Sequence, residues 1–173
     1  KQLASHISVS VVHPLMLDHG WSFERDEYAT GDALYGKDFL YQIYQQSKPD
    51  MTGRVTVPVL WDKQTEAIVS NESSEIIRMF NSAFDAVTGN RLDFWPLAMR
   101  GAIEAVNDDV YHNINNGVYR AGFASRNEAY DEAVTDLFAA LDRIEARLQV
   151  NRYLLGDTLC EADWRLFTTL VRF

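Results

Sequence analysis

The sequence has one cysteine, Cys160, in 173 residues. A single thiol excludes an internal disulfide framework and favours a reducing compartment, so we expect a cytoplasmic protein. No apolar run is long enough to cross a bilayer. Basic residues number 16 against 25 acidic ones, which gives a net charge of −9. A protein this acidic disfavours nucleic acid and anionic membranes as partners.

Both ends of the sequence lack the usual signs of a terminus. The opening residues, KQLASHISVSVV, contain no initiator methionine and no signal peptide, and they lead almost directly into a β-branched segment. The closing residues, LFTTLVRF, stop inside an apolar helical pattern. We therefore expect a fragment of a longer protein.

The first half of the sequence has the patterns of an α/β unit. Alternating β-branched and serine residues predict a strand over 6–12, and the turn residues that follow predict a long loop. The remaining expected elements are a helix over 37–49, a hairpin over 53–70 that turns around Asp62 to Glu66, and a helix over 73–89.

From Pro96 onward, hydrophobic residues recur at helical spacing. They form three stripes: Met99, Ile103, Val106, Val110 and Ile114; then Tyr130, Val134, Leu137, Leu141, Ile144 and Leu148; then Ala162, Leu166 and Leu170. The predicted fold class is α/β plus all-α. Its domains are an α/β domain over 1–90 and a helical domain over 95–173, with the linker near residues 89–95.

Pro58 stands in the middle of a predicted strand, TVPVLWD. Proline cannot donate a ladder hydrogen bond, so it belongs at an edge or a bulge. One interpretation is an ordinary trans proline on an edge strand. The other is a cis Val57-Pro58 bond, which would turn the backbone of Val57 toward a ligand. The residues alone leave both interpretations open.

The segment SNESSEII places polar residues at the start of the next helix. The free N–H groups of a helix start can bind an anion, and Ser73 adds a hydroxyl. Glu72 offers a carboxylate for an ammonium group, so the pair suits an α-amino acid zwitterion. Capping by Ser70, Asn71 or Ser73, with Glu75 following, explains the same residues, and the two roles can coexist.

A Val-Pro hairpin followed by Glu72-Ser73 and an amphipathic helix resembles the glutathione-binding half of the thioredoxin-like domain of glutathione transferases. LCEADWRLF resembles that family's capping box, with Asp163 as the acid and Cys160 where serine or threonine is usual. Longer blocks narrow the resemblance to the glutathionyl-hydroquinone reductases, the Xi class: ISVSVVHPLMLDHGWSF, GRVTVPVLWDKQTEAIVSNESSEIIRMFN, NNGVYRAGFA and ADWRLFTTLVRF.

This resemblance implies a partial thioredoxin-like domain followed by a glutathione-transferase-type helical domain, each incomplete at the outer end. It also implies a homodimer that uses glutathione as co-substrate on quinone and hydroquinone conjugates. A cysteine in an upstream Cys-Pro-Trp-Ala motif would attack the sulfur of a glutathionyl-hydroquinone and leave a mixed disulfide with glutathione. Because the sequence starts after that motif, we expect the 173-residue chain by itself to be inactive.

The resemblance assigns site residues one by one. Trp21 would pack on glutathione, and Tyr119 would be the catalytic tyrosine at the quinol oxygen. Glu72 and Ser73 would hold the γ-glutamyl end. The strand along the glutathione backbone would consist of Arg54, Val55, Thr56 and Val57, with Pro58 as its structural proline. Taken singly, these residue types are more often packing, capping or solvated groups.

Two further interpretations remain. An omega-like thioltransferase or dehydroascorbate reductase would use the same glutathione site, and a non-catalytic transferase-like module would use the fold for binding. The histidines His6, His13, His19 and His112 lack metal-ligand spacing, so no metal site is predicted. Cys160 is expected to be structural, as part of the capping box.

Overall fold

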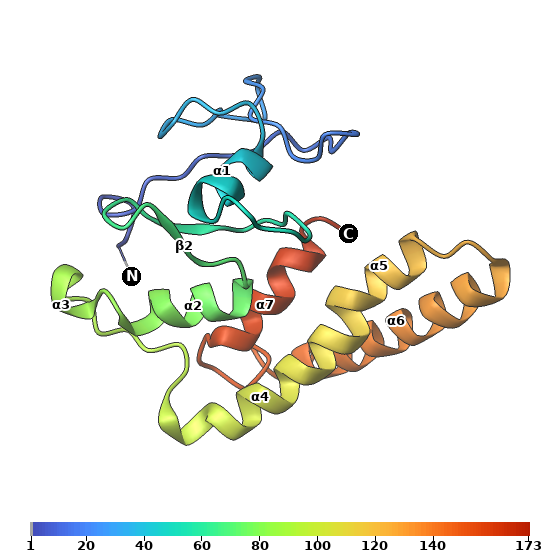
Figure 1. Ribbon diagram of the computed structural model, residues 1–173. Helices are drawn as coiled ribbons and strands as arrows, with labels where there is room; N and C mark the ends of the chain where they lie inside the picture. The colour runs from blue at the N-terminus through green and yellow to red at the C-terminus, as the bar shows by residue number, and fades with distance from the viewer. Residues whose placement is uncertain (1) are drawn as a thin grey trace. The chain divides into compact units, whose positions relative to one another are not determined.

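The computed structural model describes residues 2–173. The chain divides into two compact units, the first ending at Asn90 and the second beginning at Arg91. The first unit contains α1 (Leu40–Ser47), β1 (Leu60–Asp62), β2 (Ala67–Ser70), α2 (Ser73–Ser82) and α3 (Asp85–Thr88). The second, helical unit contains η1 (Leu97–Met99), α4 (Arg100–Asp109), η2 (Val110–Asn115), α5 (Asn116–Gly122), α6 (Asn127–Leu148) and α7 (Glu161–Leu170). Figure 1 shows the order of these elements.

The hairpin predicted over 53–70 is present, but its first strand begins only after Pro58. β1 and β2 pair antiparallel, with Asp62 opposite Ala67 and an irregularity between Leu60 and Trp61. The Asp62 carboxylate accepts the backbone N–H of Gln64 at 2.8 Å and so closes the turn. The hairpin packs on α1, because Trp61 and Ile68 join a small core centred on that helix.

The strand predicted over 6–12 is wrong. Residues 7–12 have no regular secondary structure and belong to no strand within residues 2–173. Their bonds are isolated: Val11 exchanges hydrogen bonds with Thr30, receiving one at 3.1 Å and donating one to its hydroxyl at 2.8 Å. β-branched alternation favours an extended backbone, but a strand also needs a neighbour for its ladder, and the facing loop offers only single contacts.

The two predicted helices of the first unit also differ in outcome. The helix before Pro49 is confirmed as α1. The helix over 73–89 is interrupted after Ser82, and α3 ends at Gly89 in a left-handed conformation with φ of 68°. Asn81 and Ser82 have low helix propensity, and Phe84 leaves the helical region with φ of −104°.

The helical unit is organised around a core drawn from all three predicted stripes. α4, the π-helical turn η2 and α5 follow one another along one line in Figure 1, and α6 runs back along them. Leu137 on α6 is fully buried against Gly117 on α5, where an added Cβ would meet the leucine at 3.4 Å. No helix among residues 2–173 is long and apolar enough to span a membrane.

The predicted capping box of α7 is confirmed. The Asp163 carboxylate accepts the backbone N–H of Cys160 at 2.9 Å and that of Leu154 at 2.8 Å. The thiol of Cys160 is buried and donates to the same carboxylate at 3.3 Å. Burial raises the pKa of this thiol, and the neighbouring Asp163 charge adds to the shift. Cys160 is therefore a folded-state packing and capping residue.

Leu137→Ala should lower the free energy of unfolding by about 3 kcal/mol, because it removes a fully buried side chain and leaves a cavity. The matched control is Leu97→Ala, whose side chain is largely exposed and should cost little. Urea denaturation of both variants measures the difference, and equal costs would contradict the assignment of Leu137 to the core.

Candidate functional site

The Val57-Pro58 peptide bond is cis, which settles the choice left open by the sequence. Val55 and Val59 pack against the core on either side, while Val57 is exposed. Within residues 2–173 neither the N–H nor the C=O of Val57 has a hydrogen-bond partner. The segment before β1 thus presents a free backbone donor and acceptor at the surface of the first unit.

The residues before Val57 differ in whether their polar groups have hydrogen-bond or ion-pair partners. Thr56 donates its N–H to the hydroxyl of Tyr44 at 3.3 Å, and its C=O accepts from that hydroxyl at 2.8 Å. Its backbone is therefore engaged within the protein. Arg54 is exposed and forms no ion pair within the described residues, whereas the Val55 side chain is half-buried in the core.

Ser70, two residues before the N-cap residue Glu72, holds the start of α2 from outside the helix. The hydroxyl of Ser70 accepts the N–H of Glu72 at 3.1 Å and donates to the carboxylate of Glu75 at 2.8 Å. Glu72 is the N-cap residue and α2 has no side-chain cap hydrogen bond, so this arrangement differs from the predicted capping by Ser70, Asn71 or Ser73. It leaves the exposed side chains of Glu72 and Ser73 without partners within residues 2–173, together with the N–H of Ser73.

The structure brings these two free segments close to each other. The side-chain amide of Asn71, one residue before Glu72, donates to the Thr56 hydroxyl at 3.2 Å and to the Tyr44 hydroxyl at 3.1 Å. A carboxylate, a hydroxyl and helix-start N–H groups therefore lie near an open backbone donor and acceptor. This set suits a ligand that has a zwitterionic end and a peptide-like body.

Trp21 lies in the long loop of the first unit and is half-buried. Its backbone C=O accepts the N–H of Leu40 at 2.9 Å. Two residues later, the N–H of Phe23 donates to the C=O of Asp38 at 2.7 Å. The indole packs against the core around α1. Trp21 is thus fixed at the N-terminal end of α1, on a loop that is anchored at several points.

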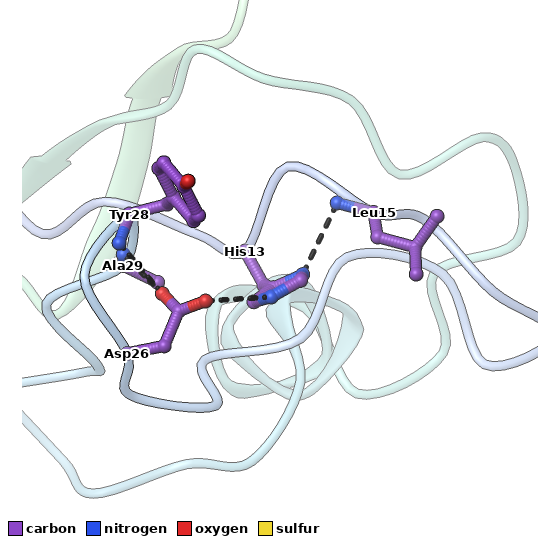
Figure 2. A network of polar contacts seen from close by, with 5 residues as sticks. All are labelled: His13, Leu15, Asp26, Tyr28 and Ala29. Carbon is purple, nitrogen blue, oxygen red and sulfur yellow. Dashed lines mark hydrogen bonds and ion pairs between the residues drawn. The ribbon is translucent and has the colours of Figure 1, made fainter.

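One anchor of this loop is a polar network, shown in Figure 2. The N–H of Leu15 donates to Nδ1 of His13 at 3.1 Å, so the proton of the neutral ring lies on Nε2 and is donated to Asp26 at 3.0 Å. The other oxygen of Asp26 accepts the N–H groups of Tyr28 and Ala29 at 2.7 and 2.8 Å. The bond from Tyr28 contributes most to a lowered pKa of Asp26, with Ala29 and His13 acting in the same direction.

Tyr119 belongs to the helical unit and is half-exposed on α5. Its ring stacks on Phe123, with centroids 6.2 Å apart and planes 3° from parallel. Arg172, just after α7, donates from Nη2 to the Tyr119 hydroxyl at 3.4 Å. The guanidinium of Arg172 thus places a positive charge beside the Tyr119 hydroxyl.

Sequence reasoning misses three residues of these arrangements. It indicates Asn71 only as a cap, and it singles out neither Tyr44, within the helix predicted over 37–49, nor Arg172. Their roles come from contacts between segments that are distant in sequence, for which a single sequence contains no signal. No cluster of three His, Cys, Asp or Glu side chains among residues 2–173 has the arrangement of a metal site.

Comparisons with known proteins show which proteins this chain is similar to. Residues 127–173 match the family model "Glutathione S-transferase, C-terminal domain". The whole chain is 57% identical to a glutathionyl-hydroquinone reductase of Escherichia coli K12, of which it covers 53%. A glutathione-bound structure of a glutathione transferase homolog from Escherichia coli K-12 matches 99% of this protein and 56% of that one, with a TM-score of 0.95 and 56% identity. The glutathione transferase Xi of Phanerochaete chrysosporium matches 99% of this protein and 59% of its own length, with a TM-score of 0.94 and 49% identity.

The fold and these matches define the class of the protein: the chain belongs to the glutathione transferase family, with a partial thioredoxin-like domain and a helical C-terminal domain. Within that family it belongs with the glutathionyl-hydroquinone reductases of the Xi class, as its resemblance indicated. The chain spans a little more than half the length of the relatives reported above.

Asp26→Ala should speed amide hydrogen exchange at Tyr28 and Ala29 by about fivefold, the effect of losing one net hydrogen bond each. Asp26→Asn keeps an oxygen for both amides and changes only the contact with His13, so exchange should stay near the wild-type rate. Hydrogen exchange followed by NMR measures both variants.

The same network has a defined pH dependence. Because the folded pKa of Asp26 lies below its ordinary value of 3.8, its contribution is present above that value and disappears as the pH falls through the lowered one. The difference between wild type and Asp26→Ala should therefore vanish in acid. An undiminished difference there, or equal exchange in the Ala and Asn variants, would contradict the network.

Proposed function

We propose that the protein reduces glutathionyl-hydroquinones to hydroquinones with glutathione as the reductant. The observation that carries this proposal is the free backbone of Val57 next to the unpartnered Glu72 and Ser73. The cysteinyl part of glutathione would pair with the N–H and C=O of Val57. The γ-glutamyl ammonium would meet Glu72, and its carboxylate would meet the hydroxyl and N–H of Ser73.

The remaining predicted residues take weaker or indirect parts in this proposal. The backbone of Thr56 is already bonded to Tyr44, so Thr56 would support the site rather than donate to the ligand. Arg54 is exposed and offers a charge to the glycyl carboxylate. Trp21 would contribute a ring wall, and Val55 would anchor the segment in the core.

In the proposed reaction, a cysteine thiolate attacks the sulfur of the glutathionyl-hydroquinone. The carbon–sulfur bond breaks, its electron pair passes into the ring, and the ring takes up a proton to give the free hydroquinone. A second glutathione, as thiolate, attacks the mixed disulfide and releases oxidised glutathione and the enzyme thiolate. Its thiol proton balances the proton taken up by the ring, so the net change consumes one glutathione and one conjugate.

Cys160 and Tyr119 are the residues to consider for the nucleophilic thiolate and for the charge that develops on the quinol oxygen. Cys160 does not fit the nucleophile, because it is buried and its pKa is raised. The resemblance puts the nucleophile in a Cys-Pro-Trp-Ala motif ahead of residues 6–12. Tyr119 would hydrogen-bond the quinol oxygen, where negative charge develops as the bond breaks, and Arg172 beside its hydroxyl would stabilise that charge.

Ser73→Ala and Glu72→Gln should each weaken glutathione binding by about tenfold, since each removes one charge-assisted contact. Ser82→Ala is the matched control, because Ser82 is exposed at the far end of α2. Isothermal titration calorimetry with glutathione measures the dissociation constants. Unchanged affinity in both site variants would overturn the proposed glutathione clamp.

Tyr119→Phe should slow release of the hydroquinone by about a hundredfold, the lower range for loss of a general acid–base group. Tyr130→Phe, on α6 and similarly exposed, should leave the rate unchanged. The assay is single-turnover release of hydroquinone from a glutathionyl-hydroquinone by the protein that carries its nucleophilic cysteine. A wild-type rate for Tyr119→Phe would show that this hydroxyl takes no part in the step.

A further inference from the structure

The hydroxyl of Tyr44 uses its complete hydrogen-bonding capacity within the first unit. It donates its proton to the C=O of Thr56 at 2.8 Å. Its two lone pairs accept the backbone N–H of Thr56 at 3.3 Å and the amide N–H of the Asn71 side chain at 3.1 Å. A phenol hydroxyl offers one donor and two acceptor positions, so none is left over for solvent or ligand.

Asn71 completes the arrangement from the other side. Its side-chain amide nitrogen donates toward two neighbouring oxygens, the Tyr44 hydroxyl at 3.1 Å and the Thr56 hydroxyl at 3.2 Å. The opposite orientation of this amide would face its oxygen toward a phenol whose proton is already given to Thr56. The bonds therefore fix the orientation of Asn71, and with it the residue that immediately precedes Glu72.

The phenol itself cannot move freely. Tyr44 is 3% exposed and belongs to the core formed with Phe23, Leu40 and Ile43. A rigid ring held in a core places its hydroxyl at a fixed point. At that point the hydroxyl contacts both Thr56, which precedes Val57, and Asn71, which precedes Glu72.

We propose that the Tyr44 hydroxyl is the positioning group of the glutathione site. Through Thr56 it holds the open backbone of Val57, and through Asn71 it holds the start of α2. One hydroxyl thereby sets the distance between these two halves of the site. This inference rests on the proposed function, because the ligand that bridges the two halves is glutathione. Tyr44 contacts no ligand itself and acts through its two neighbours.

A purely structural role for Tyr44 makes a different prediction. A core tyrosine that only fills space would, on loss of its hydroxyl, change stability and leave the ligand affinity of the folded protein unchanged. If the hydroxyl positions the site, its removal changes the affinity of the folded protein for the ligand, because the two halves of the site are no longer held at a fixed distance. The two roles therefore separate in a binding measurement made well below the unfolding temperature.

The experiment measures the dissociation constant of glutathione by calorimetry for wild type, Tyr44→Phe, Asn71→Ala and the double variant. Tyr44→Phe and Asn71→Ala should each weaken binding by about tenfold, the effect of one or two lost net hydrogen bonds. Because both remove the same link, the double variant should bind about as weakly as the weaker single variant rather than a hundredfold more weakly. Thermal unfolding of each variant establishes the fraction folded at the temperature of the titration.

Tyr41→Phe is the matched control. Tyr41 lies on the same helix, is exposed, and its hydroxyl has no hydrogen-bond partner within residues 2–173. It should bind glutathione as the wild type does. If Tyr44→Phe does not fold, Asn71→Ala decides alone, since Asn71 is half-buried and outside the core cluster.

The outcomes separate this inference from the proposed function. A wild-type protein that binds no glutathione overturns the proposed function, and the inference with it. A wild-type protein that binds glutathione, with unchanged affinity in Asn71→Ala or in a folded Tyr44→Phe, overturns the positioning role and leaves the proposed function standing. Additive effects in the double variant would also overturn the shared link.

Discussion

Backbone N–H and C=O groups must find partners or face water, and this requirement shapes the segment that leads into β1. Strand pairing serves only Leu60–Asp62, because the ladder with β2 starts beyond Pro58. Thr56 finds a side-chain partner in Tyr44, and Val57 finds none within the described residues. The groups that the ladder does not use are the ones that a peptide-like ligand can use.

The start of α2 follows the same logic. The first N–H groups of any helix lack intrahelical partners. Ser70, held in place by Glu75, accepts the one on Glu72, and the side chains of Glu72 and Ser73 take no part in capping. In the sequence, local hydrogen bonding and ligand binding compete for the same residues. In the structure the N–H of Glu72 donates to Ser70, so Glu72 and Ser73 keep exposed side chains for the proposed ligand.

The features predicted from the sequence are those set by local chemistry. The capping box of Asp163, the turn at Asp62 and the end of α1 before Pro49 depend on residues within a few positions of one another. The segment over 6–12 failed as a strand because pairing depends on a distant neighbour, which alternation does not encode. For the same reason nothing in the sequence distinguishes Tyr44 from the other residues of its helix, because its hydroxyl makes its contacts only when residues 56 and 71 fold against it.

Cys160 shows how the same chemistry can be used for folding instead of reaction. A thiol at a helix start would gain reactivity if it were exposed, because the positive end of the helix favours the thiolate. Here burial raises its pKa, and its hydrogen bond to the Asp163 carboxylate acts in the same direction, since it favours the protonated thiol. The environment that completes the capping box therefore disfavours the thiolate form of Cys160. In the proposed reaction this sequence would supply groups for recognition and proton transfer, while the thiolate chemistry would require a cysteine other than Cys160.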